Sequence, residues 1–411
     1  MHYQTISVVG LGYIGLPTAA VFASRRVKVI GIDVNKLAVE TINRGEIHIV
    51  EPDLDKVVQE AVNEGYLRAS TTPAPADAFL IAVPTPFKGD HEPDLSYIES
   101  ASKAIAPVLK KGDLVVLEST SPVGATEQMA AWMAETRPDL SFPQTHGEAS
   151  DIRIAHCPER VLPGQVLREL VENDRVIGGM TPKCSNAAVA LYKIFVEGEC
   201  VVTNARTAEM CKLTENSFRD VNIAFANELS IICDKLKINV WELIQLANRH
   251  PRVSILQPGP GVGGHCIAVD PWFIVSKSPR DARLIRTARE VNDRKPKVII
   301  EKVSQAASSF KSPKIACFGL AFKANIDDLR ESPALDIAIK LAKLFPDAVM
   351  AVEPNIDIKG HGLATELNLV DAETALRTCD IAVLLVDHSE FKSIPKEKLS
   401  RAMVIDTKGI W

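Results

Sequence analysis

Short apolar runs rich in β-branched residues alternate with stretches of helical periodicity in the first and last parts of the chain. Uninterrupted apolar runs of this length are typical of buried strands in a parallel sheet with helices on both faces. Strands are predicted over 6–9, 27–32, 79–83, 114–117, 152–155 and 175–177, and again over 314–318, 348–352, 381–386 and 403–405. This alternation predicts α/β architecture with two mostly parallel, doubly wound sheets.

The middle of the chain has a different pattern. Residues 205–248 contain no Gly or Pro, which predicts a long helix with a break near 237–239. A second helical stretch, rich in Arg and Lys, covers 281–307. Three domains are therefore predicted, with a central helical domain between two α/β domains: 1–200, 201–310 and 311–411.

Composition narrows the class of protein. The 411 residues are 46% hydrophobic and 24% charged, as in a soluble protein of two or three domains, and the net charge of −5 argues against a nucleic-acid partner. No apolar run approaches the roughly 18 residues of a membrane span, and the N-terminus lacks a signal-peptide layout. The eight cysteines include no C-x-x-C pair, so zinc and other metals are not expected. These features predict a cytoplasmic protein with reduced thiols.

A glycine-rich turn follows the first predicted strand directly. It reads G-x-G-x-x-G, it opens a helical stretch over 16–24, and the next strand ends on Asp33, eighteen residues after the last glycine. In this context the motif predicts a Rossmann-like fold in which backbone N–H groups and the helix N-terminus bind a pyrophosphate. Asp33 is expected to accept hydrogen bonds from ribose hydroxyls, which favours NAD over NADP. The alternative is a glycine-rich turn without a ligand. The residues of the turn are Gly10, Gly12, Tyr13, Ile14 and Gly15.

Polar loops follow three of the predicted strands, at 83–86, 119–124 and 157–160. Ligands of doubly wound sheets bind beyond the carboxyl ends of the strands. Thr120, Glu159 and Arg160 fall at equivalent ends, so they are candidates for contacts with nicotinamide, ribose and substrate. Ordinary turn chemistry is the alternative for many single residues of these loops.

The long middle helix carries Lys212, Asn216 and Arg219 on one face, at spacings of four and three residues. A solvated stripe is the ordinary interpretation of such a face. Apolar residues on the other faces, among them Phe218 and Phe225, instead predict a buried helix whose Lys and Arg have a specific role. The middle helices also present an apolar face without an evident partner in the chain, which predicts a homodimer.

Residues 259–271 form a loop rich in glycine and proline that ends on Cys266 and then Asp270. Such a loop lets its backbone approach a ligand closely, and Cys266 is the one nucleophile it presents. A structural turn with a core cysteine is the alternative.

The second predicted sheet has only Gly319 at its first turn, so a second dinucleotide is not expected there. A polar loop over 322–333 follows, in which Lys323 and Arg330 are candidate phosphate ligands. An exposed charged loop is the alternative.

Together these segments resemble the UDP-glucose/GDP-mannose dehydrogenase superfamily of nucleotide-sugar 6-dehydrogenases, from end to end. His265 and Val269, with residues 249–253 and 258–261, resemble the UDP-N-acetylhexosamine branch. Family members often carry a basic residue just beyond the position of Trp411 that reaches the substrate of a neighbouring subunit. The motifs that carry the resemblance are G-L-G-Y-I-G-L-P at 10–17, S-T-S-P-V-G at 119–124, P-E-R at 158–160, K-L-T-E-N-S-F-R-D at 212–220, G-G-H-C-I-A-V-D-P at 263–271 and F-K-x-x-x-x-D-x-R-E-S-P at 322–333.

The resemblance implies oxidation of a sugar C6 alcohol to a carboxylate with two NAD, through a thiohemiacetal and a thioester on Cys266. The expected substrate is UDP-N-acetyl-D-mannosamine, with UDP-N-acetyl-D-glucosamine as the alternative, in the synthesis of surface polysaccharide precursors. The implied catalytic residues are Cys266, Lys212, Asn216, Asp270, Glu159 and Thr120. The implied NAD contacts are Gly10, Gly12, Tyr13, Ile14, Gly15, Asp33, Thr85, Thr126 and Arg330. The implied substrate contacts are Arg160, Val161, Lys212, Asn216, Arg219, His250, Arg252, Gly263 and Lys323.

Two other classes are less compatible with the sequence. A short-chain sugar epimerase or dehydratase needs a Tyr-x-x-x-Lys pair, and none of the five tyrosines has a lysine four residues later. A non-catalytic NAD sensor would not need Lys212, Asn216 and Cys266 together.

Overall fold

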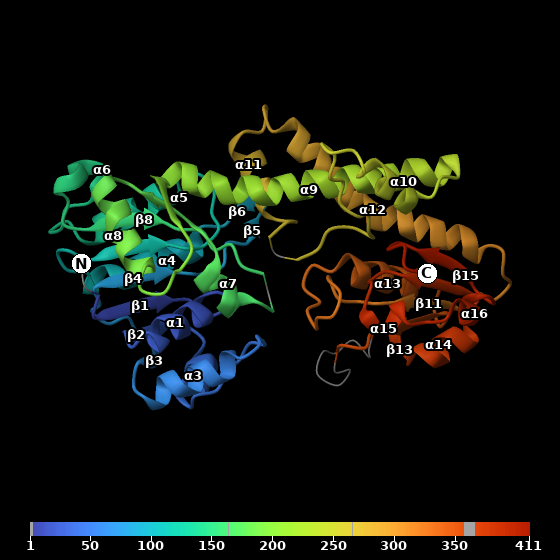
Figure 1. Cartoon of the computed structure of the whole chain (residues 1–411), viewed down its shortest axis with the longest axis horizontal. Helices are drawn as coiled ribbons and strands as arrows, with labels where there is room; N and C mark the ends of the chain where they lie inside the picture. The colour runs from blue at the N-terminus through green and yellow to red at the C-terminus, as the bar shows by residue number, and fades with distance from the viewer. Residues whose placement is uncertain (1–2, 163, 265, 357–365) are drawn as a thin grey trace. The chain divides into compact units, whose positions relative to one another are not determined.

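The structure is a computed structural model that describes residues 3–162, 164–264, 266–356 and 366–411 (Figure 1). The chain divides into two compact units, Met1–Glu215 and Asn216–Trp411. Each unit contains a largely parallel sheet flanked by helices, and long helices follow the first sheet in the sequence. The predicted fold class, two doubly wound α/β domains with a helical domain between them, is confirmed.

The sheet of the first unit has the strand order β10-β9-β8-β7-β4-β1-β2-β3. From β3 to β8 all neighbours are parallel, as in a doubly wound nucleotide-binding sheet. The sequence did not indicate that β9 runs antiparallel to β8. The strands are β1 (Thr5–Val9), β2 (Lys28–Ile32), β3 (Leu67–Ser70), β4 (Ala78–Ile81), β7 (Leu114–Leu117), β8 (Arg153–His156), β9 (Arg175–Gly179) and β10 (Cys200–Asn204).

Helices cover both faces of this sheet because alternate strand residues point to opposite sides. Val8 and Val116 pack on the side of α1, α3, α7 and α8. Val9 and Val115 pack on the side of α4 and α5. A short hairpin, β5 (Phe87–Lys88) with β6 (Glu92–Pro93), follows β4. The helices are α1 (Gly15–Ser24), α2 (Lys36–Asn43), α3 (Leu54–Asn63), α4 (Ser96–Ile105), α5 (Ala125–Thr136), α6 (Pro143–His146), α7 (Val166–Glu172) and α8 (Pro182–Tyr192).

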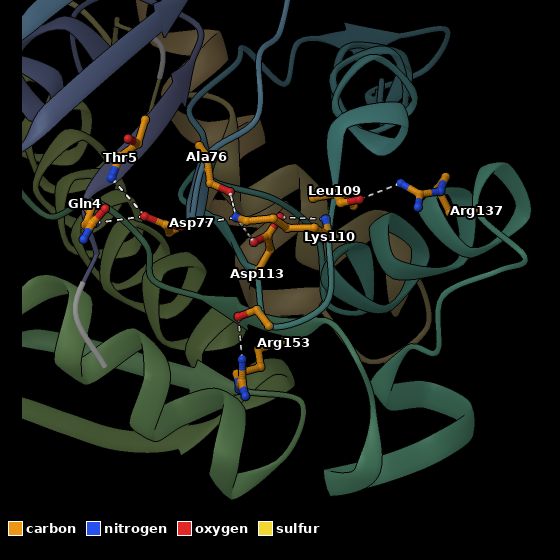
Figure 2. Close-up of polar contacts among 10 residues, drawn as sticks. Gln4, Thr5, Ala76, Asp77, Leu109, Lys110, Asp113, Arg137 and Arg153 are labelled. Atoms are coloured by element: carbon orange, nitrogen blue, oxygen red, sulfur yellow. Dashed lines mark hydrogen bonds and ion pairs between the residues drawn. The ribbon is translucent and has the colours of Figure 1, made fainter.

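The amino-terminal ends of β1, β4 and β7 are tied together by charged side chains, as Figure 2 shows. Asp77 accepts hydrogen bonds from the backbone N–H groups of Gln4 and Thr5, at 2.9 and 3.0 Å. The Lys110 ammonium donates to the carbonyl of Ala76 and to the carboxylates of Asp77 and Asp113. These contacts stabilise the amino-terminal ends of the strands, opposite to the end that carries the glycine-rich turn after β1.

The middle helices are α9 (Ala205–Leu236), α10 (Val240–Ala247), α11 (Asp270–Lys277) and α12 (Arg283–Ala307). The boundary between the two units falls inside α9. The predicted break is observed: Lys237 has φ 59°, and Asn239 caps α10 by accepting from the N–H groups of Trp241 and Glu242. No helix in the described part of the chain is long and apolar enough to cross a membrane.

The second sheet has the order β13-β12-β11-β14-β15 with all neighbours parallel. Its core contains Ile315, Cys317, Ile337 and Leu341, all shielded from solvent. The strands are β11 (Ile315–Phe318), β12 (Val349–Val352), β13 (Asn368–Leu369), β14 (Ile381–Leu384) and β15 (Met403–Asp406), and the helices are α13 (Pro333–Leu344), α14 (Ala372–Thr378), α15 (Ser389–Lys392) and α16 (Lys396–Leu399).

Candidate active site

The turn between β1 and α1 is shaped to hold a phosphate group. Gly10 has φ +90°, and a Cβ atom on Gly15 would lie 1.7 Å from the carbonyl oxygen of Gly10, so neither position accepts a side chain. A Cβ on Gly12 would meet nothing within 4 Å, which leaves open space above the turn. No side chain caps the N-terminus of α1 in the described chain. Its positive dipole end therefore remains available to an anion, and the residues present fit a dinucleotide.

Asp33 lies at the carboxyl end of β2, partly exposed, beside this turn. Its Oδ2 accepts from the N–H of Leu11 at 2.8 Å, and its Oδ1 accepts from the N–H of Asn35 at 2.9 Å. The carboxylate is thus fixed in place. A carboxylate has about four lone-pair positions, so both oxygens can still accept from ribose hydroxyls.

The loops after β4 and β7 approach each other through Ser119, whose hydroxyl donates to the carbonyl of Val83 at 2.7 Å. Thr85 has a buried hydroxyl oxygen without a protein partner, as expected of a group that bonds a ligand. Thr120 is half-buried. Thr126 is fully buried, and its N–H and hydroxyl both donate to Glu209, so its contact with NAD stays a prediction.

Glu159 follows β8 and is nearly buried, with an exposed fraction of 7%. Its Oε2 accepts from Arg175 at 2.6 Å, and Arg175 itself is buried under Tyr192 and Phe195. Arg160, the next residue, forms an ion pair of 2.8 Å with Glu215 of α9. Val161 packs against the core of the first unit.

The candidate residues of α9 differ in exposure. Asn216 is buried, Lys212 is half-buried and Arg219 is exposed. The predicted burial of the whole helix is therefore wrong for Arg219. It is also wrong for Phe218 and Phe225, which are 68% and 52% exposed. Apolar residues on several faces did not indicate burial because part of that surface stays uncovered in a single chain.

The cysteine loop presents its thiol at the surface. Cys266 is exposed, whereas five of the other seven cysteines are buried. Its carbonyl accepts from the N–H groups of Val269 and Asp270, so the residue sits in the turn that begins α11. Asp270 is 3% exposed, and its Oδ2 accepts from the Asn216 side chain at 2.5 Å. A buried core cysteine, the alternative interpretation, does not describe Cys266.

The glycines before Cys266 lie against the polar loop of the last domain. A Cβ on Gly263 would stand 2.4 Å from the carbonyl oxygen of Glu331 and 2.7 Å from the Pro333 ring. Gly264 has φ +82° and lies on the ring of Phe322. The fold therefore brings together two motifs that are about sixty residues apart in the sequence.

The remaining candidates of the second unit are exposed: His250, Arg252, Lys323 and Arg330. Arg330 pairs with Asp328 through hydrogen bonds of 2.5 to 3.0 Å. His265 lies outside the described residues. The described residues contain no group of three or more His, Cys, Asp or Glu side chains able to hold a metal ion.

Comparison with known proteins assigns each part of the chain to one family. Residues 4–196 match the NAD binding domain of the UDP-glucose/GDP-mannose dehydrogenase family, residues 206–294 its central domain and residues 316–411 its UDP binding domain. The chain belongs to this family. It is an NAD-dependent nucleotide-sugar dehydrogenase, and NAD is its cofactor.

Two of the relatives that the chain matches over its full length are enzymes with different names. The chain is 69% identical to a UDP-N-acetyl-D-mannosamine dehydrogenase of Yersinia pestis, with full coverage of both chains. It is 68% identical to an NDP-N-acetyl-D-galactosaminuronic acid dehydrogenase of Ralstonia nicotianae, covering 100% of this chain and 97% of the other.

Solved structures agree in fold. A UDP-D-ManNAc dehydrogenase from Pyrococcus horikoshii superposes with a TM-score of 0.87 at 40% identity, over 99% of this chain and 96% of the other. A UDP-N-acetyl-mannosamine dehydrogenase from Staphylococcus aureus gives 0.86 at 42% identity, over 99% and 95%.

Sequence reasoning missed several buried polar residues near these sites. Glu118, Arg175 and Tyr192 surround Glu159, and Glu209 holds the start of α5. The available signal was a charged residue at the edge of an apolar strand, Glu118 after 114–117 and Arg175 at the start of 175–177. That signal does not say which other side chain the charge meets.

Proposed function

We propose that the enzyme oxidises UDP-N-acetyl-D-mannosamine at C6 to the uronate, with two NAD for each sugar. The observation that carries the proposal is the exposed Cys266 thiol at the start of α11, in a chain that is 66–69% identical to named UDP-N-acetyl-D-mannosamine dehydrogenases over its full length. NAD, when bound, supplies the hydride acceptor for both oxidations.

In this scheme the first oxidation removes a hydride and the hydroxyl proton from C6 and leaves an aldehyde. The Cys266 thiolate adds to the aldehyde carbon, which forms a C–S bond and an oxyanion. Loss of a second hydride converts this thiohemiacetal into a thioester. Water then cleaves the C–S bond, releasing the carboxylate and returning the thiol.

The chain's own residues have distinct parts in the scheme. Lys212 stabilises the oxyanions and moves protons, and Asn216 helps to polarise the same oxygen. Asp270 and Glu159 manage protons and water during hydrolysis, and Thr120 positions that water. The hydrogen bond from Asn216 to Asp270 supports this arrangement because it fixes the carboxylate four residues after the cysteine.

The remaining candidate residues bind the two ligands. The turn at Gly10, Gly12 and Gly15 with Asp33 holds NAD, together with Tyr13, Ile14, Thr85, Thr126 and Arg330. The sugar nucleotide is held by Arg160, Val161, Arg219, His250, Arg252, Gly263 and Lys323.

A second candidate substrate has a specific observation in its favour. The 68% identity to NDP-N-acetyl-D-galactosaminuronic acid dehydrogenases nearly equals the identity to the mannosamine enzymes. A galacto-configured N-acetylhexosamine is therefore the second candidate, beside the gluco epimer.

The test is NADH formation with UDP-ManNAc, UDP-GalNAc, UDP-GlcNAc and UDP-glucose, measured as NADH per sugar consumed. Two NADH with UDP-ManNAc at the highest kcat/KM is expected. Cys266→Ala should lose at least about a thousandfold in this turnover, ~4 kcal/mol, with unchanged NAD affinity by calorimetry. Cys211 is partly exposed, so Cys211→Ala is the control and should behave as wild type. Wild-type turnover in Cys266→Ala would contradict the covalent route, and a preference for UDP-GalNAc would select the second substrate.

We also propose that the enzyme acts as a homodimer, in the cytoplasm, in the synthesis of surface polysaccharide precursors. The dimer is supported by large apolar side chains that α9 exposes at Phe218, Phe225, Ile232 and Leu236.

A further inference from the structure

Four buried polar side chains connect α9 and α12 to the cysteine loop. Arg289 donates to Asp220 Oδ1 at 2.6 Å, and Asn292 donates to the same oxygen at 2.8 Å and to the Asp220 carbonyl at 3.0 Å. Asn227 donates to Asn292 Oδ1 at 2.9 Å, and Asn227 Oδ1 accepts from the Gly259 N–H at 2.9 Å. All four side chains are at most 2% exposed. Asp220 Oδ2 and Arg289 Nε have no hydrogen-bond partner in the described chain, but the bonds that link the four side chains to one another and to Gly259 form one continuous series.

The hydrogen bonds from Arg289 through Asp220, Asn292 and Asn227 to the Gly259 N–H are called the relay below. The chemistry of Asp220 sets which group donates at each step of this relay. An ionised carboxylate can only accept, and Arg289 can only donate. Asn292 must therefore turn its NH2 group toward Asp220, which leaves its oxygen facing Asn227. Asn227 must then turn its own NH2 toward that oxygen, which leaves its oxygen facing the loop. Each amide orientation follows from the previous one, and the last one presents an acceptor to Gly259.

The relay ends where the glycine loop begins. Gly259 is seven residues before Cys266, and the glycines between them pack closely on Pro333 and Phe322. Five residues earlier on α9, Asn222 donates to the Ser254 carbonyl at 3.0 Å and accepts from the Leu256 N–H at 2.9 Å. The segment that leads into the loop is thus held at both ends by asparagines of α9.

We propose that Asp220, Asn292 and Asn227 are positioning residues for the Cys266 loop. They act at a distance from Cys266, through the Gly259 N–H, by fixing where the start of the loop lies against α9. The inference rests on the proposed role of Cys266 as the nucleophile. If that role holds, a misplaced loop should impair capture of the aldehyde more than the first hydride transfer.

Two substitutions at Asp220 separate the acceptor from the charge. Asp220→Asn and Asp220→Leu both remove the negative charge beside Arg289, which keeps Asp293 as a second partner. Only the leucine removes the side-chain oxygen that accepts from Asn292, and the Asp220 carbonyl remains as a second acceptor. Asn292→Leu breaks the relay in the middle without a change of charge.

The measurement is NADH formed per sugar in the presence of a hydrazine that traps free aldehyde. Wild type and Asp220→Asn should give two NADH per sugar, with kcat within about threefold of each other. Asn292→Leu should lose about tenfold or more in kcat and move toward one NADH per sugar with trapped aldehyde. Asp220→Leu should change in the same direction but by less, because the Asp220 carbonyl still accepts from Asn292. Melting temperature and NAD affinity serve as checks of folding, because a purely structural defect would lower both oxidations together.

The outcomes distinguish the two proposals. If wild type releases aldehyde or yields one NADH, the proposed function fails first. If wild type gives two NADH while folded Asn292→Leu also gives two at wild-type kcat, the relay has no positioning role. Should Asn292→Leu not fold, a folded Asn227→Leu, which lacks the acceptor of the Gly259 N–H, would refute the relay if it gave two NADH per sugar at wild-type kcat.

Discussion

At the scale of single residues, two buried carboxyl groups of the first unit lie near one guanidinium, that of Arg175. Arg175 bonds Glu159 directly, and Glu118 accepts from the Tyr192 hydroxyl at 2.6 Å. Burial raises the pKa of Glu118 to about 7, the negative charge of Glu159 adds to this, and Arg175 opposes it. Glu118 therefore keeps its proton up to about pH 7, while the Arg175 guanidinium bonds Glu159.

This pKa predicts a pH dependence of stability. Between pH 4.5 and about 7 the unfolded chain releases the Glu118 proton while the folded chain keeps it, so the free energy of unfolding falls as pH rises. Glu118→Gln removes this contribution and retains an acceptor for Tyr192. From pH 4.5 to 7.5, the free energy of unfolding of the variant, measured with urea, should rise by up to about 3 kcal/mol relative to that of wild type. Parallel stability curves for the two proteins would show that Glu118 does not titrate in this range.

At the scale of elements, the two ends of the strands in the first sheet differ in function. The carboxyl ends carry glycines, Asp33 and Glu159, with open space at Gly12. At the amino ends, Lys110 donates to three oxygens around β4 and β7. Asp113 is only 2% exposed, so it depends on this lysine.

Lys110→Met should therefore destabilise the sheet without affecting the site. The Lys110 side chain is 54% exposed, so water screens part of the interaction. We expect a loss of about 1–2 kcal/mol in urea unfolding. Lys111→Met is the matched control: its pair with Asp151 spans 3.2 Å, the lysine is 74% exposed, and a change below about 0.5 kcal/mol is expected. Equal losses in both variants would argue against a special role for Lys110.

At the scale of the whole molecule, α9 exposes a row of large apolar side chains along one face. Phe218, Phe225 and Ile232 recur at intervals of seven residues, with exposed fractions of 68%, 52% and 43%, so they share one face of the helix. Leu236, at 63%, extends that face. Uncovered apolar faces of this kind mark association surfaces.

Replacing Phe218 and Phe225 by Gln should convert a dimer to a monomer at micromolar concentration, because the change removes the two aromatic side chains of the face. Light scattering after size exclusion measures the mass. Leu344→Gln, on an exposed position of α13 at 58%, is the control and should leave the mass unchanged. A wild-type protein that elutes as a monomer, or a double variant that stays dimeric, would contradict the proposed interface.

The sequence by itself determined those features that depend only on residues close together in the chain. Strand 114–117, the helix break at 237–239 and the G-x-G-x-x-G turn are all observed, because strand runs, caps and positive-φ glycines act within a few residues. The NAD cofactor followed from the same local pattern, since the phosphate-binding turn, the helix N-terminus and Asp33 lie within one βαβ unit.

Only the tertiary structure decided which distant side chains meet. Glu159 pairs with a residue sixteen positions away, and Asn292 reaches Asp220 across seventy-two positions. The burial predicted for Arg219 and Phe218 was wrong, because apolar residues on a helix do not indicate whether the surface that covers them belongs to the same chain. Long-range contacts follow from how the sheets and helices pack, and local periodicity carries no record of that packing.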